Sequence, residues 1–103
     1  MKSYYIIFDK NGEVFFLIGK KENWCLFSSE NQQMPLSTPV LDEKQRLEYN
    51  GKQILVYESN MNLPVSISSD YRSYLWATKQ SVLSKLTGED LEIFNFVLNN
   101  LEM

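Results

Sequence analysis

Few side chains in this sequence could do acid–base or metal chemistry. Histidine is absent from the 103 residues, which excludes the commonest general base and the catalytic arrangements built on it. The single cysteine, Cys25, can form neither an internal disulfide nor a zinc site, because both need further thiolates. It lies between Trp24 and Leu26 in an apolar run, so we interpret it as a small buried hydrophobe rather than a reactive thiol.

Carboxylates are the remaining candidates for catalysis. Asp42, Glu43 and Glu48 form a group near the middle of the chain, and two carboxylates that hold a divalent metal could hydrolyse a phosphate ester. The competing interpretation, which we favour, is a solvated charged face balanced by Lys44 and Arg46. We therefore predict no catalytic residue, no metal and no cofactor. Glu43 and Glu48 are the metal-ligand candidates only if the chain is an enzyme.

Aromatic side chains are numerous, with six Tyr, six Phe and two Trp. Most of them are expected in the core. Large rings at strand ends often line the mouth of a pocket or an interface. We therefore predict Trp24, Tyr74 and Trp76 as binding residues, with Tyr74 and Trp76 on one face of a strand and Leu75 on the other.

Composition restricts the size of the fold and the class of partner. The length suits one domain, residues 1–103, and the 44% hydrophobic content with 14% aromatics is that of a globular chain. A net charge of −3 argues against nucleic acid as the main partner, because a phosphate-binding face needs clustered Lys and Arg. A protein partner or self-association is expected instead.

Location and source follow from the same data. No segment approaches the roughly 18 consecutive apolar residues that a membrane-spanning helix needs, and no secretory signal is apparent. We expect a cytoplasmic protein with no membrane partner, a location that is compatible with delivery into another cell by a route that needs no signal. The many Asn, Lys, Ile, Phe and Tyr residues, whose codons are AT-rich, favour a bacterial or phage source.

Turn signals and apolar runs predict an α+β fold. The strongest signal is a hairpin in which strands Tyr4–Phe8 and Glu13–Ile18 flank an Asn-Gly turn. Both strands are apolar at nearly every position, so both faces of their sheet should be covered. Residues 28–39 are expected to form a loop, and Leu41–Tyr49 fits either a short helix or an edge strand. The other expected elements are strands Trp24–Phe27, Gln53–Glu58 and Tyr71–Trp76, a helix Lys79–Leu86 capped by Thr78, and a last helix from Thr87 to Leu101 with an apolar stripe.

Taken together, these segments resemble the Nudix hydrolase fold. In that family a hairpin with an Asp-x-x-Gly turn leads to a W-x-L-P-G-G segment, and the chain ends with a strand finishing in Trp, a short helix and a final helix. The hairpin here spans Ile6 to Ile18, and Trp24-Cys25-Leu26-Phe27-Ser28-Ser29 keeps W-x-L but replaces P-G-G. The resemblance implies a mixed or antiparallel sheet with an N-terminal hairpin and two C-terminal helices packed on it, in a trimmed version of the family fold.

The sequence departs from the family at its catalytic signature, G-x5-E-x7-R-E-U-x-E-E-x-G-U, whose glutamates hold divalent metal. When Gly51 is set on the last glycine of the signature, Glu48 is the only metal-type glutamate that remains. The Arg-Glu pair and the second glutamate are missing. We therefore identify the chain as a degenerate Nudix-like domain that lacks the Nudix box.

Three functions follow from these observations. The first is a non-catalytic binding module, most simply a protein-binding one. The second is a small acidic inhibitor or immunity-type protein that blocks a toxin, effector or defence enzyme, because an acidic surface is steered towards basic active sites. The third is a divergent metal-dependent hydrolase of nucleoside diphosphate derivatives that uses Glu43 and Glu48.

Overall fold

The computed structural model describes residues 2–9, 15–30, 35–37, 41–59 and 66–101. Its centre is a seven-stranded mixed sheet. Strand β1 (Ser3–Asp9) pairs in parallel with β7 (Lys52–Ser59) and antiparallel with β2 (Phe15–Lys20) and β4 (Phe27–Ser29). The sheet is completed by β6 (Leu41–Tyr49) beside β7, and by β3 (Trp24–Cys25) and β9 (Ser73–Thr78) beside β2.

Strand β1 is central because its side chains are apolar on both faces. All seven of its residues are buried. Tyr4, Ile6 and Phe8 point into one hydrophobic core, and Tyr5 and Ile7 point into a second core on the opposite face. The expectation that both faces of this sheet are covered is confirmed.

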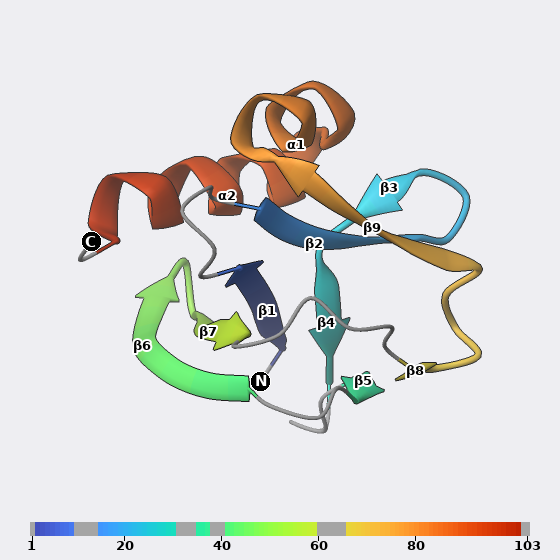
Figure 1. The fold of residues 1–103 in the computed structure, drawn as a ribbon. Helices are drawn as coiled ribbons and strands as arrows, with labels where there is room; N and C mark the ends of the chain where they lie inside the picture. The colour runs from blue at the N-terminus through green and yellow to red at the C-terminus, as the bar shows by residue number, and fades with distance from the viewer. Residues whose placement is uncertain (1, 10–14, 31–34, 38–40, 60–65, 102–103) are drawn as a thin grey trace.

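Both helices cover the first face, as Figure 1 shows. Helix α1 (Lys79–Lys85) begins as predicted, because the hydroxyl of Thr78 accepts a hydrogen bond of 3.3 Å from the amide of Ser81. Helix α2 (Gly88–Asn100) buries Phe94, whose ring meets that of Phe16 edge to face at 4.8 Å. The predicted arrangement of two C-terminal helices packed on a sheet is therefore confirmed. No helix in the described part of the chain could cross a membrane.

A small two-stranded ribbon covers the second face. Strands β5 (Leu36–Ser37) and β8 (Ser66–Ile67) pair antiparallel, and Leu36 and Ile67 pack into the second core. In Figure 1 this ribbon lies on the side of the sheet opposite the helices. The expectation of a loop throughout residues 28–39 is wrong in part, since β4 reaches Ser29 and β5 lies inside the interval.

The open assignment of Leu41–Tyr49 is resolved as a strand. Strands β6 and β7 form an antiparallel hairpin whose turn residues, Asn50 and Gly51, both have positive φ (51° and 75°). An Asn-Gly pair adopts this conformation at low cost, and the resulting turn sets the register of the two strands. The pairing shifts between Glu43 and Gln45, which leaves Lys44 at a β-bulge.

Other boundaries differ slightly from expectation. The predicted strand Trp24–Phe27 divides at Leu26 into β3 and β4, because its first part pairs with β2 and its second with β1. The predicted strand Tyr71–Trp76 is observed as β9, two residues later. The first hairpin is present as β1 and β2, and residues 10–12 of its predicted turn lie outside the described residues.

Candidate functional site

The two candidate metal ligands from the sequence are held apart on β6. Glu43 lies opposite Tyr57 and Glu48 opposite Gln53, and these partners are four residues apart along β7. At about 3.3 Å per residue, the two glutamates are separated by about 13 Å of strand. Oxygen ligands of one Mg²⁺ each lie about 2 Å from the ion, so these two carboxylates do not share a site in this arrangement. Among the described residues, no group of three or more Cys, Asp and Glu side chains could hold a metal.

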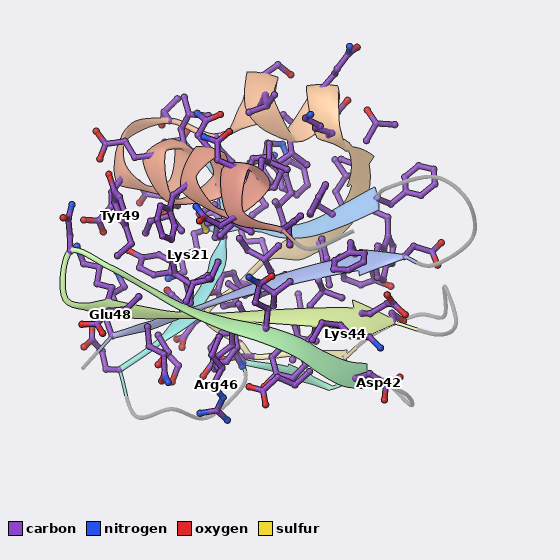
Figure 2. All side chains as sticks on the ribbon, turned by 90° about the vertical axis from the view of Figure 1, so that its left-hand side faces the viewer. Lys21, Asp42, Lys44, Arg46, Glu48 and Tyr49 are labelled. Carbon is purple, nitrogen blue, oxygen red and sulfur yellow. The ribbon has the colours of Figure 1, made fainter. Side chains whose placement is uncertain are left out.

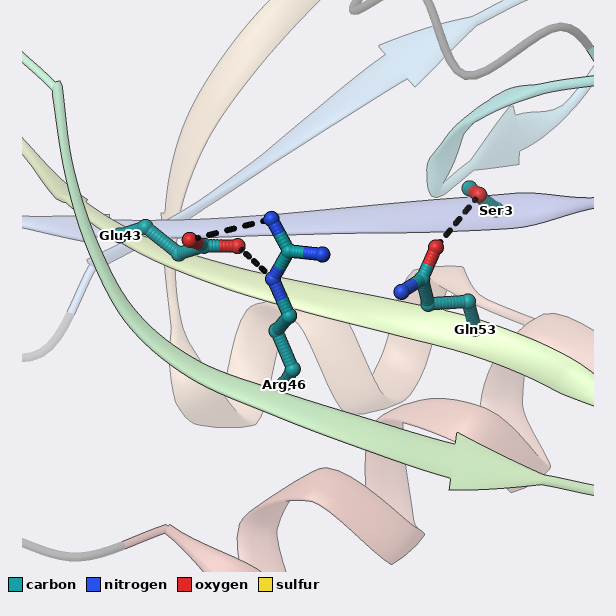
Figure 3. Close-up of polar contacts among 4 residues, drawn as sticks. All are labelled: Ser3, Glu43, Arg46 and Gln53. Atoms are coloured by element: carbon teal, nitrogen blue, oxygen red, sulfur yellow. Dashed lines mark hydrogen bonds and ion pairs between the residues drawn. The ribbon is translucent and has the colours of Figure 1, made fainter.

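Charge pairing on β6 supports the solvated-face interpretation. The bulge at Lys44 brings Glu43 to the same side of the strand as Arg46, and the Arg46 Nε donates to Glu43 Oε1 at 2.6 Å (Figure 3). Figure 2 shows Arg46 on the lower side of the strand and Tyr49 on the helix side. The ion pair is exposed and therefore worth little stability. A charged, bulged edge strand of this kind resists pairing with a second chain.

The three predicted binding residues are divided between the two faces of the sheet. Tyr74 and Trp76 lie on β9 opposite Gly19 and Leu17, and both pack half-buried against the second core. Trp24 lies opposite Lys20 and packs against the first core, on the helix side. The structure thus brings Tyr74 and Trp76 together and separates them from Trp24.

Trp24 lies in a cleft of about 390 Å³ between the β2–β3 turn and the junction of the two helices. Lys20 places its ammonium group 5.8 Å from the centre of the Trp24 ring, within the range of a cation–π contact. Lys85 comes from the last turn of α1, and Thr87 is the N-cap residue of α2. The cleft is lined by Lys20, Glu22, Asn23, Trp24, Lys85 and Thr87.

The carboxylates in the first turn of α2 are bonded to groups elsewhere in the fold. Glu89 accepts a hydrogen bond of 2.5 Å from the Tyr4 hydroxyl and also pairs with the Lys52 ammonium group. Asp90 accepts a hydrogen bond of 3.4 Å from the amide of Leu26. Thr87 makes no side-chain capping bond, so the predicted cap position is correct but its hydroxyl is not used for capping.

These two neighbouring carboxylates have opposite pKa shifts. The hydrogen bond from Lys52, and to a smaller extent the one from Tyr4, lowers the pKa of Glu89. Burial raises the pKa of Asp90. Burial, followed by the hydrogen bond to Glu89, also raises the pKa of the Tyr4 hydroxyl. The charged form is thus favoured at Glu89 and disfavoured at Asp90.

The shifts predict opposite effects on the pH dependence of stability. A lowered pKa means that Glu89 adds stability above its unfolded pKa and loses it as pH falls. A raised pKa means that Asp90 adds stability below its unfolded pKa and loses it as pH rises through the folded value. We therefore expect urea unfolding between pH 3 and 7 to show two opposite changes. As pH falls, the free energy of unfolding should decrease less steeply in Glu89→Gln than in the wild-type chain, and more steeply in Asp90→Asn. Equal slopes in both variants would contradict these assignments.

The sequence predicts a buried side chain at Cys25, and the structure shows a half-buried one. Its Sγ donates to the carbonyl of Gly19 at 3.3 Å, and burial raises the pKa of the thiol. A raised pKa lowers the thiolate fraction and with it the reactivity towards electrophiles. The environment of Cys25 thus agrees with an unreactive structural residue.

Comparison with solved structures identifies the architecture. A C. elegans Ap4A hydrolase in a binary complex has a TM-score of 0.60 with 12% identity, over 97% of this chain and 98% of that one. A Nudix hydrolase from M. smegmatis, RenU, has a TM-score of 0.64 with 8% identity, over 99% and 87%. The chain has a Nudix-like fold.

A third structure of similar fold is the C-terminal domain of mouse MUTYH in a complex with human PCNA. It has a TM-score of 0.53 with 11% identity, and the alignment covers 96% of this chain and 86% of that one. No family model and no curated protein sequence matches the chain. The likeness is therefore one of fold.

Sequence reasoning identified Trp24 but not the residues that share its cleft. In the sequence, Lys20 is followed by Lys21 and Glu22, and Lys85 lies within the predicted helix Lys79–Leu86, so neither position indicates a binding residue. They are separated by 65 positions in the chain and meet because α1 follows β9, which pairs with β2. The only local signal was Thr87, whose position before Gly88-Glu89-Asp90 predicts a helix start next to Lys85.

Proposed function

We propose that this chain is a non-catalytic binding module, with a protein as its ligand, on a Nudix-like fold that lacks the Nudix box. The observation that carries the proposal is the short interval between β4 and β6. Only residues 30–40 lie between these strands, and the whole catalytic signature is longer than that interval. In the family, the signature follows the W-x-L-P-G-G segment, which Trp24–Ser29 resembles. The described part of the interval contains β5 and no helix.

The conformation of Lys44–Gly51 supports the same proposal. This was the stretch with the best match to the end of the signature, which is a loop–helix–loop in the family. Here it is an edge strand followed by a tight turn. Glu48, the one glutamate in this stretch, is exposed, and Glu43, which precedes the stretch, is paired with Arg46. These positions suit a charged sheet edge better than a metal site.

A protein ligand is supported by the half-buried aromatic residues and by one comparison. Trp24, Tyr74 and Trp76 are each partly exposed, and aromatic residues often anchor protein interfaces. The MUTYH domain of similar fold was solved bound to the protein PCNA. A domain with a fold similar to that of this chain can therefore bind a protein, and we extend that role to this chain.

The experiment combines a turnover assay with partner capture. Purified chain, incubated with nucleoside diphosphate derivatives and with Mg²⁺ or Mn²⁺, is expected to give no turnover above a no-protein blank. Immobilised chain is expected to retain a specific protein from lysate of its source cells, and a Trp24→Ala, Tyr74→Ala, Trp76→Ala triple variant should retain less. Folding of that variant is checked by circular dichroism. Capture that is equal for both chains, or absent for both, would contradict the proposal.

A metal-dependent hydrolase is the second candidate, because two of the reported structural neighbours are named as hydrolases. It predicts turnover in the same assay that is abolished in Glu48→Gln and retained in Gln45→Glu, a charge change on the opposite face of β6. The third candidate, an acidic inhibitor, predicts a captured partner that dissociates at high salt and carries a basic active site.

A further inference from the structure

We propose that the cleft at Trp24 binds an acidic segment of the partner protein, through carboxylate or phosphoryl oxygens. This inference rests on the proposed protein-binding function and specifies the chemistry of the ligand. Three features of the described residues support it: the charge of the cleft, the helix end that opens into it, and its apolar wall.

The cleft is positively charged in a chain that is negative overall. Its titratable lining residues are Lys20, Lys85 and Glu22, which carry two positive charges and one negative, whereas the whole chain has a net charge of −3. Lys20 is held beside the Trp24 ring by its cation–π contact. Ammonium groups on two different elements can approach one anion from two sides, and charge-assisted hydrogen bonds of this kind are strong ones.

Thr87, the N-cap residue of α2, brings the N-terminal end of that helix to the same wall. The first amides of a helix have no partner inside the helix and attract negative charge. Thr87 lines the cleft, and its hydroxyl makes no capping bond to α2. The acidic residues that follow it are bonded to other groups, Glu89 to Tyr4 and Lys52, and Asp90 to the amide of Leu26.

The indole of Trp24 gives the cleft an apolar side. An anion alone would leave that surface unused, whereas an acidic residue with an apolar neighbour would fill both parts. A volume of about 390 Å³ suits one or two side chains. The cleft therefore fits a short peptide segment in which an acidic or phosphorylated residue adjoins an apolar one.

The test is a titration of ¹⁵N-labelled chain, with the indole N–H signal of Trp24 as the probe. Three nine-residue peptides share one apolar core and carry Glu, phosphoserine or Gln at the flanking positions. At low salt, the Glu or the phosphoserine peptide should shift the Trp24 signal with at least tenfold higher affinity than the Gln peptide. The ratio of the first two affinities distinguishes a carboxylate from a phosphoryl ligand.

A matched pair of double variants completes the test. Lys20→Gln with Lys85→Gln should reduce the affinity for the better acidic peptide at least tenfold. Lys44→Gln with Lys79→Gln removes the same total charge from exposed positions outside the cleft and should leave the affinity within twofold of wild type. Equal losses in both variants, or equal affinity for the acidic and Gln peptides, would overturn the inference. AMP is titrated in the same way as a ligand that is not a peptide. If AMP binds more tightly than either acidic peptide, the assignment to a protein segment is overturned.

The outcomes also separate this inference from the proposed function. A partner captured from lysate that remains bound to the Lys20→Gln, Lys85→Gln chain overturns the inference and leaves the binding function standing. Capture lost in that variant and kept in the Lys44→Gln, Lys79→Gln control supports both.

Discussion

Replacement of Phe94 by alanine is expected to lower the free energy of unfolding by about 3–5 kcal/mol. The ring is fully buried on the inner face of α2 and packs edge to face on Phe16 at 4.8 Å. Its removal leaves a cavity between the helix and the sheet that neighbouring side chains can fill only in part. Domains of this size are stable by only about 5–15 kcal/mol, so the loss is a large share of the total. Urea denaturation followed by circular dichroism measures it.

The neighbouring position supplies the control for this prediction. Asn95 is exposed on the same turn of α2, and Asn95→Ala should change the free energy of unfolding by no more than about 0.5 kcal/mol. Phe94→Leu should fall between the two, because it keeps most of the buried volume. A Phe94→Ala chain that unfolds at the same urea concentration as Asn95→Ala would show that the first core does not depend on this contact.

Gly19→Ala is expected to destabilise the fold by about 1–3 kcal/mol, although the change is small and the backbone is ordinary. A Cβ at this position would lie 2.7 Å from Cδ1 of Tyr71 and 2.9 Å from Cε1 of Phe27. Both rings are buried and pack on each other at 4.7 Å. The Tyr71 hydroxyl also accepts a hydrogen bond of 2.9 Å from the amide of Ser28, which limits how far the ring can retreat.

A double-mutant cycle tests whether this crowding is the cause. Phe27→Leu removes one of the two rings, so Gly19→Ala should cost at least about 1 kcal/mol less in that background than in the wild-type chain. Thermal unfolding of the four chains supplies the data. Additive losses in the cycle would contradict the steric explanation.

The elements that could be predicted from sequence are those with local signals. Residues 4–8 are apolar on both faces, and this alone predicts a central strand, which is observed as β1. Thr78 begins α1 because a threonine in extended conformation can bond the amide three residues later. The Asn50-Gly51 pair predicts a tight turn, and the turn is present with both φ values positive.

The assignments that stayed open or failed depend on contacts between distant segments. Leu41–Tyr49 has no strong propensity, and it is a strand because β7 offers it a free edge. Strand β5 has only two residues and exists because β8, almost thirty residues later, pairs with it. The bulge at Lys44, which puts Glu43 beside Arg46, cannot be derived from the order of the residues.

The sequence by itself determined the α+β class, the central hairpin strands, the helix starts and the scarcity of catalytic groups. These properties depend on residue type and on spacing over a few positions. Tertiary structure alone decided where the candidate residues meet. It separated Glu43 from Glu48 along one strand, placed Trp24 on the opposite face from Tyr74 and Trp76, and joined Lys20 to Lys85 in one cleft. The physical reason is that strand pairing and helix packing bring together side chains that are far apart in the chain, at positions that no local pattern records.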